Sequence, residues 1–195
     1  RERVWIAGDL ISSGDVNTVW YSNAYDPEDW TTPSETGSIQ VETFDGDVIK
    51  GIVNWLDDVL IFKKHTIWRV DGDIPSEYTL TQIYSSKGTI DGGSLCTDGS
   101  LCFFMAGDGL YQYNGTEVVP VLTTEIKDIF QEYDPYSTDT INVHIRGIVN
   151  NNKVYMFNIN TAGRFFYSGH SFCLVYDTIS KTTQIMRSAK NLNDA

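Results

Sequence analysis

Residues 48–84 read VIKGIVNWLDDVLIFKKHTIWRVDGDIPSEYTLTQIY. Four segments of this stretch are rich in Val, Ile, Thr and aromatic residues, which favour strands, and turn-forming residues lie between them. The expected strands are Val48–Trp55, Val59–Phe62, Thr66–Val70 and Tyr78–Tyr84. Short connections of this kind join antiparallel neighbours. Residues 48–84 therefore predict a four-stranded antiparallel meander.

The same pattern recurs along the chain of 195 residues. Paired strand segments that predict hairpins are Arg3–Gly8 with Asn17–Ser22, Asp58–Phe62 with Thr66–Val70, Leu101–Met105 with Leu110–Tyr113, and Lys153–Ile159 with Phe172–Asp177. Their starting positions 3, 58, 101 and 153 are 55, 43 and 52 residues apart. This spacing is close to the roughly 40–50 residues of a propeller blade. The repeats are expected at about 1–44, 45–86, 87–135 and 136–190.

These repeats predict an all-β fold, a β-propeller-like array of about four antiparallel four-stranded blades. One short helix is expected from Thr123 or Thr124 to about Glu132. The chain is expected to form a single domain over residues 1–195, either a small ring or part of a larger propeller. The first repeat lacks an obvious innermost strand, and Thr31–Ser38 is expected to be a surface loop. A sandwich of two sheets is the alternative.

Charge and hydropathy exclude several classes of protein. The formal net charge is −12, from 26 acidic and 14 basic residues, and no run of basic residues is longer than Lys63-Lys64. Tight nucleic-acid binding is therefore not expected, because it needs a basic surface. The longest apolar runs are too short to cross a membrane. No signal peptide is expected at the start of the chain.

The three cysteines do not indicate a disulfide framework. Cys96 and Cys102 flank Asp98-Gly99, a dipeptide that favours two-residue hairpins. In that register Thr97 would face Ser100, and the two sulfur atoms would lie on opposite faces of the sheet. Cys173 has no obvious partner. We expect reduced, buried thiols in a protein that is assembled inside a cell.

No catalytic or metal-binding motif stands out, and the chain is predicted not to be an enzyme and to need no cofactor or metal. The acidic turns do not match a calcium loop and are explained by turn formation. His65, His144 and His170 lie too far apart for a zinc site. Residues 12–20 resemble a sialidase Asp-box only faintly, and the arginines are scattered.

Two loops are the candidate protein-contact sites. The first contains Asp26, Pro27 and Trp30, after the strand expected at Asn17–Ser22. The second is the insertion between the last two hairpin strands, and its candidate residues are Arg164, Phe165, Phe166 and Tyr167. Exposed aromatic residues of this kind form contact patches. Alternatively, the aromatic residues of the insertion fold back onto a neighbouring blade.

Three blocks resemble proteins of tailed-phage virions. They are Asn17–Trp30, in which Tyr-Ser is followed by Asp-Pro-x-x-Trp, the block GIVNWLDDVLIFKKHTIWRVDGD at 51–73, and the block GSLCFFMAGDGLYQYNGTEVVPV at 99–121. The family is the β-propeller group of tail and head-closure proteins, which includes the packaged-DNA stabilisation proteins of short-tailed phages. The resemblance carries over no catalytic residues.

The resemblance implies a non-enzymatic structural component of a tailed phage or prophage, in the tail or at the head–tail connection. Its expected partners are other virion proteins (portal, connector or tail subunits), and homo-oligomers in the assembled particle are left open. The expected location is the virion, after assembly in the host cytoplasm, without membrane binding. The alternatives are a carbohydrate-binding host-recognition propeller and a glycoside hydrolase, whose paired carboxylates cannot be chosen from 26 acidic residues.

Overall fold

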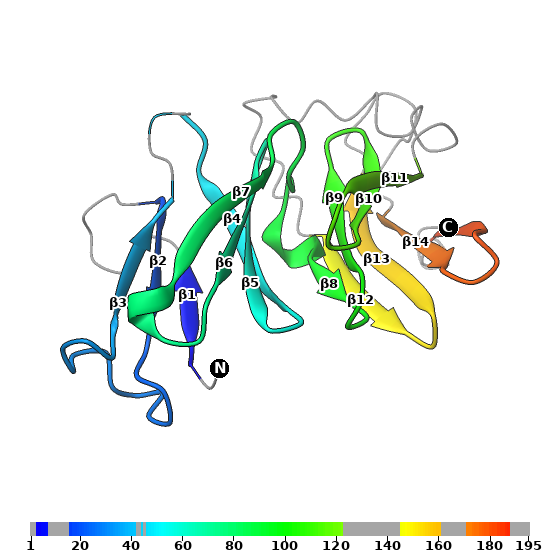
Figure 1. Ribbon diagram of the computed structural model, residues 1–195. Helices are drawn as coiled ribbons and strands as arrows, with labels where there is room; N and C mark the ends of the chain where they lie inside the picture. The colour runs from blue at the N-terminus through cyan, green and yellow to red at the C-terminus, as the bar shows by residue number, and fades with distance from the viewer. Residues whose placement is uncertain are drawn as a thin grey trace, which may run out of the picture. The chain divides into compact units, whose positions relative to one another are not determined.

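The structure is a computed structural model that describes residues 3–7, 16–41, 44, 46–122, 145–160 and 171–187. In these ranges the regular structure consists of antiparallel β-strands and two short 3-10 turns, η1 (Pro75–Glu77) and η2 (Gly92–Ser94) (Figure 1). Contacts divide the chain into two units, Arg1–Gly92 and Gly93–Ala195. Each unit contains two sheets.

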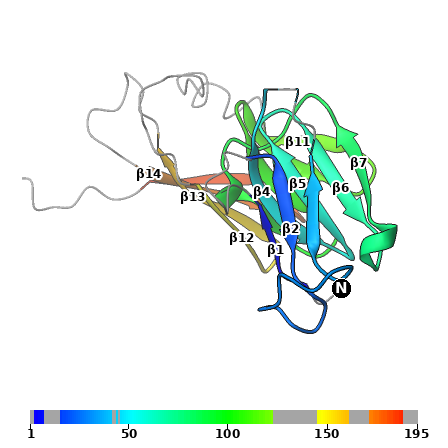
Figure 2. The same cartoon turned by 90° about the vertical axis from the view of Figure 1, so that its left-hand side faces the viewer.

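The first unit contains a three-stranded sheet and a four-stranded sheet, both in sequence order. The strands of the first sheet are β1 (Trp5–Ala7), β2 (Thr18–Tyr21) and β3 (Gly37–Gln40). The strands of the second sheet are β4 (Ile49–Trp55), β5 (Asp58–Lys63), β6 (Ile67–Asp71) and β7 (Thr79–Tyr84). In Figure 2 the first sheet lies in front of the second.

Side chains from both sheets form the core of the first unit. Val19 and Val41 from the first sheet region pack with residues of the second sheet, and all of them are almost fully buried. The members from the second sheet are Val59, Ile61 and Val70. They lie at alternate positions of β5 and at the end of β6, as expected for side chains on one face of a sheet. Burial of this apolar surface holds the two sheets together.

The second unit contains two four-stranded sheets. The strands of one are β8 (Cys96–Thr97), β9 (Cys102–Ala106), β10 (Gly109–Tyr113) and β11 (Val118–Leu122). The strands of the other are β12 (Arg146–Asn150), β13 (Lys153–Asn160), β14 (Ser171–Asp177) and β15 (Thr183–Arg187). Each strand pairs antiparallel with its neighbour in sequence.

The two sheets of the second unit also pack against each other. The Phe103 ring of β9 lies 6.4 Å from the Tyr176 ring of β14, measured between ring centroids. At Gly147 of β12, a Cβ atom would lie 2.3 Å from the Ser94 carbonyl oxygen and 3.0 Å from Cys96 Sγ. Only glycine therefore allows β12 to lie this close to η2 and β8.

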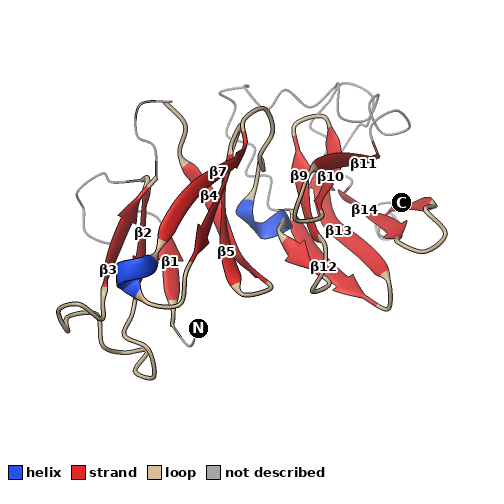
Figure 3. Ribbon diagram, in the orientation of Figure 1, coloured by secondary structure: helices blue, strands red, loops and turns tan. Residues whose placement is uncertain are grey.

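The all-β prediction is confirmed, and so are the four predicted hairpins (Figure 3). They correspond to β1–β2, β5–β6, β9–β10 and β13–β14. The helix expected up to about Glu132 lies outside the described residues. The single domain, the repeat boundaries and the ring of blades stay predictions.

One predicted loop is partly wrong. Gly37 and Ser38 lie in the segment expected to be a loop, but they belong to β3. This strand pairs with β2, and its residue Ile39 faces Val19 and packs on the core. Ile39 and Val41 alternate with polar residues, which is the pattern of a strand with one buried face. This pattern was missed because the surrounding residues are mostly polar.

The predicted register of the β8–β9 hairpin is also wrong. Thr97 faces Cys102 and Cys96 faces Phe103. The Asp98 carboxylate accepts hydrogen bonds from the backbone N–H groups of Ser100 and Leu101, at 3.0 and 2.7 Å, and this makes the turn longer than two residues. The observed pairing differs from the predicted one by two positions, so the sulfur atoms of Cys96 and Cys102 still lie on opposite faces of the sheet. All three cysteines are free thiols.

Replacing Ile61 by alanine is expected to lower the free energy of unfolding by about 2–5 kcal/mol, because the side chain is fully buried between the two sheets of the first unit. The matched control is Ile179→Ala. Ile179 is 74% exposed, and its replacement should change stability by less than about 0.5 kcal/mol. Urea unfolding followed by tryptophan fluorescence measures both, and equal midpoints for the two variants would contradict the assigned core.

The thiols give a second prediction. Burial raises the pKa of Cys96 to about 12 and also raises the pKa values of Cys102 and Cys173. Because the thiolate is the reactive form, Cys96 and Cys102 should not react with a thiol reagent in the native protein. Titration with Ellman's reagent should give at most the half-buried Cys173 before unfolding and three thiols in urea. Fewer than three in urea would indicate a disulfide.

Candidate functional site

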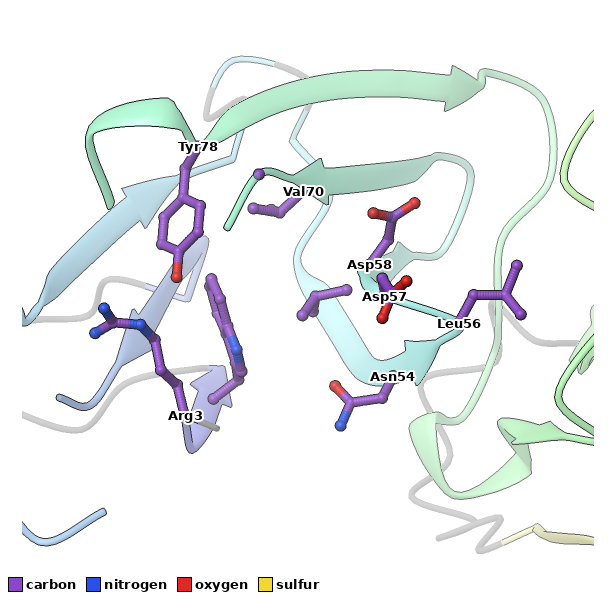
Figure 4. A pocket seen from close by; sticks show the side chains of 10 residues that line it. Arg3, Asn54, Leu56, Asp57, Asp58, Val70 and Tyr78 are labelled. Atoms are coloured by element: carbon purple, nitrogen blue, oxygen red, sulfur yellow. The ribbon is translucent and has the colours of Figure 1, made fainter. Parts of the chain in front are cut away.

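A pocket of about 130 Å³ lies in the first unit, between β1 and the β4–β5 hairpin. Arg3 and Tyr78 lie on one side of it and Asn54, Asp57 and Asp58 on the other (Figure 4). One wall is therefore aromatic and basic, and the opposite wall carries an amide and two carboxyl groups. The pocket is smaller and more polar than a typical site for a drug-sized molecule, so it suits a small polar ligand.

Three aromatic rings form the first wall and its support. The Trp5 ring of β1 lies 5.3 Å from the Tyr21 ring and 5.4 Å from the Tyr78 ring, and Tyr21 meets Tyr78 edge-on at 5.2 Å. Such tilted and edge-to-face contacts are favourable for aromatic rings. Gly37 makes room for Tyr21, because a Cβ atom there would lie 2.6 Å from the Tyr21 hydroxyl oxygen. The rings are thus fixed before any ligand binds.

Arg3 is the basic group of this wall, and its side chain is only 2% exposed. Nη1 donates to the backbone carbonyls of Ser22, at 2.7 Å, and of Glu35, and Nη2 donates to Glu35 Oε2 at 3.1 Å. The guanidinium carbon lies 5.7 Å from the centre of the Tyr21 ring, which adds a cation–π contact. Nε is buried and makes no hydrogen bond within the described part of the chain.

Burial raises the pKa of the Tyr78 hydroxyl, and the positive charge of Arg3 opposes this change. The Tyr78 hydroxyl is therefore protonated and uncharged near neutral pH, because its ordinary pKa is already 10.0. A neutral phenol can both donate and accept a hydrogen bond. Tyr78 lies at the end of η1 and just before β7, so a short 3-10 turn positions it over the pocket.

The opposite wall is formed by the end of β4, the β4–β5 turn and the start of β5. Asn54 and Asp57 are exposed, whereas Asp58 is partly buried, and burial raises the pKa of Asp58 while Arg69 opposes the rise. Arg69 Nε lies 3.8 Å from Asp58 Oδ2, and Arg69 Nη2 lies 3.2 Å from Asp71 Oδ2. Asp58 is thus a carboxyl group with an adjacent cation.

The loop at residues 23–36, which contains the first group of predicted contact residues, is organised around Asp29. The Oδ1 atom accepts hydrogen bonds from the backbone N–H groups of Thr31 and Thr32, at 2.9 and 3.1 Å, and Oδ2 accepts one from Asn23 Nδ2 at 2.8 Å. The Asp29 N–H donates to the Asp26 carbonyl. Hydrogen bonds from Thr32, from Asn23 and from the backbone of Thr31 hold the pKa of Asp29 well below its usual range.

The structure places the first group of predicted contact residues on this loop. Asp26 and Pro27 are exposed, and Trp30 is half-buried. Tyr25, which was not predicted, is 86% exposed with a positive φ of 68°. Arg3 joins the loop to the pocket through Glu35. The second predicted group, Arg164, Phe165, Phe166 and Tyr167, lies outside the described residues.

The arrangement at Asp29 recurs at three other turns. In each, a side-chain oxygen accepts hydrogen bonds from the backbone N–H groups two and three positions later, and the residues are Asp98, Asn114 and Asp177. Such side chains replace a backbone partner and favour turns. Among the described residues, no group of three or more His, Cys, Asp or Glu side chains is arranged to hold a metal ion.

The pocket residues were not predicted from the sequence. Arg3, Trp5, Asn54, Asp58 and Tyr78 are up to 75 positions apart in the chain, and only sheet packing brings them together. One sequence feature could have indicated the pocket. Arg3 lies close to Trp5 in the chain, and Arg and Trp side chains are enriched at binding surfaces.

Comparison with known proteins assigns no family: no protein-family model matches the chain, and no curated protein matches it. In the part of the chain that the structure describes, no helix is long and apolar enough to cross a membrane.

Replacing Asp29 by asparagine is expected to lower stability near neutral pH, because asparagine has one acceptor oxygen and directs an NH2 group toward Asn23 or the backbone donors. The folded-state pKa of Asp29 is lowered from the ordinary 3.8, so its contribution is fully present above pH 3.8 and is lost as the pH falls further. The difference between the urea midpoints of the two proteins should therefore be smaller at about pH 2 than at about pH 6. A constant difference would contradict the role of the carboxylate.

Proposed function

We propose that this chain is a non-enzymatic structural component of a tailed-phage or prophage virion, in the tail or at the head–tail connection, that binds neighbouring virion proteins through its loops. The resemblance of the blocks at 17–30, 51–73 and 99–121 to phage virion proteins supports the class of protein. The ordered loop at residues 23–36 supports binding through loops, and it is the observation that carries the proposal.

The strand order supports the propeller architecture that belongs to this proposal. Three of the four sheets among the described residues have four strands, and within each sheet the strands pair in sequence order. Immunoglobulin-type sandwiches instead use Greek-key connections that carry the chain between sheets. A propeller blade is a four-stranded meander of the type seen here.

The loop at residues 23–36 is suited to protein contacts because internal hydrogen bonds hold its backbone. The Asp29 hydrogen bonds fix the backbone on both sides of the exposed residues Tyr25, Asp26 and Pro27. A loop that is already in its bound shape loses less conformational entropy on association. Tyrosine is enriched among the residues that dominate binding energy, and Tyr25 is 86% exposed.

The net charge of −12 fits the expected surroundings of such a protein. An acidic surface repels nucleic acid, so a subunit near a DNA conduit would not hold the DNA. The proposed partners are portal, connector or tail subunits, and the proposed location is the virion, after assembly in the host cytoplasm.

Immunogold electron microscopy on particles from an induced lysate of the source strain tests the proposal. Antibody against this chain is expected to label the tail or the head–tail junction. The variant Tyr25→Asn removes the exposed ring and keeps a residue that tolerates positive φ, and it should reduce labelling about tenfold, as expected for a central aromatic contact.

The control variant is Ile179→Asn, which removes an exposed apolar side chain from the β14–β15 turn and should leave labelling unchanged. Unlabelled particles with the wild-type chain would overturn the virion assignment. Normal labelling with Tyr25→Asn would overturn the contact assignment of the loop and leave the virion assignment in place.

A further inference from the structure

We infer that the pocket between β1 and the β4–β5 hairpin binds one neutral pyranose ring of a glycan. The inference goes beyond the structural role and is independent of it, because it depends on the size and chemistry of the pocket and not on what the exposed residues of the loop bind.

The size of the pocket matches one six-membered ring. Its volume is about 130 Å³. A protein cavity of about 150 Å³ holds a benzene molecule, so a volume of this order has room for a single ring. Leu56 and Asp57 at its margin are exposed, and the pocket therefore opens at the surface, where the rest of a glycan can remain in solvent.

The aromatic wall matches the apolar face of a sugar. The C–H groups on one side of a pyranose form an apolar surface that packs on an aromatic ring. Trp5 and Tyr78 provide such rings, and their contacts with each other and with Tyr21 fix the ring planes. A preformed wall lowers the entropic cost of binding.

The polar wall matches the hydroxyl groups of a sugar. The carboxyl oxygens of Asp57 and Asp58 accept hydrogen bonds from hydroxyl groups, and the Asn54 amide can both donate and accept. Hydrogen bonds from hydroxyls to carboxylates are charge-assisted and therefore among the stronger ones. On the other side, the neutral Tyr78 hydroxyl lines the pocket and can donate to or accept from a hydroxyl group of the ring.

The charges around the pocket favour a neutral ligand. Arg3 is paired with the Glu35 carboxylate, and Asp58 lies next to the Arg69 guanidinium. A phosphate or carboxylate ligand would meet the carboxyl groups of Asp57 and Asp58. This brings like charges together, which is unfavourable at short distance. A polyhydroxylated neutral ring avoids this repulsion.

The test uses the full chain and a panel of methyl pyranosides, with binding followed by NMR of the tryptophan indole N–H signals. The signal of Trp5 is assigned with the variant Trp5→Phe. The panel contains the glucoside, galactoside, mannoside, xyloside, fucoside, rhamnoside, N-acetylglucosaminide and N-acetylgalactosaminide. At least one should shift the Trp5 signal in a saturable way, with a Kd on the order of 1 mM for a single ring.

Two variants and one control locate the binding site. Asn54→Ala and Asp58→Asn should each weaken binding about tenfold, because each removes or weakens a hydrogen bond to the ring. Gln82→Ala, a change at an exposed residue of the same unit that does not line the pocket, should leave the affinity unchanged. The backbone NMR spectrum of each variant verifies that it is folded.

Three results would overturn the inference. The first is the absence of a saturable shift with every member of the panel up to about 100 mM, two decades above the expected Kd. The second is an equal response to the acyclic polyol sorbitol or to inorganic phosphate. The third is unchanged affinity in folded Asn54→Ala and Asp58→Asn proteins. None of these results bears on particle labelling, so failure here and failure of the virion role are separate outcomes.

Discussion

A buried guanidinium group organises the first unit of this protein. Removing a charge from water is costly unless its donors find acceptors, and Arg3 finds them in the carbonyls of Ser22 and Glu35 and in the Glu35 carboxylate. These acceptors lie after β2 and near the end of the 23–36 loop, so one side chain joins three segments. The aromatic wall of the pocket and the exposed loop therefore depend on the same anchor.

The sequence predicted the fold well wherever pairing is local. The hairpins β5–β6 and β9–β10 follow from short apolar runs and turn residues that are neighbours in the chain. Prediction failed where a side chain changed the turn, as at Asp98, whose two hydrogen bonds shift the register. It failed also for β3, whose inward residue Ile39 is recognisable as a core residue only when the second sheet is present.

The candidate site was much less predictable. The exposure of Asp26 and Pro27 could be predicted because turn chemistry is a local property, whereas their role in protein contacts stays a prediction. Arg3 and Tyr78 could not, since their proximity arises from the packing of two sheets that are far apart in sequence. No local pattern marks a residue as part of a pocket wall when the opposite wall comes from another sheet.

The turns in which an aspartate carboxylate accepts backbone N–H groups affect how the protein behaves in acid. The chain has an isoelectric point of about 4.5, where the repulsion between molecules disappears. The pKa values of Asp29 and Asp177 are lowered, so these two carboxylates remain ionised and their turns stay capped at that pH. As the pH falls, the protein therefore loses solubility before these turns lose their hydrogen bonds. Isoelectric precipitation should deposit protein in which these turns are still formed, and neutral buffer should redissolve it.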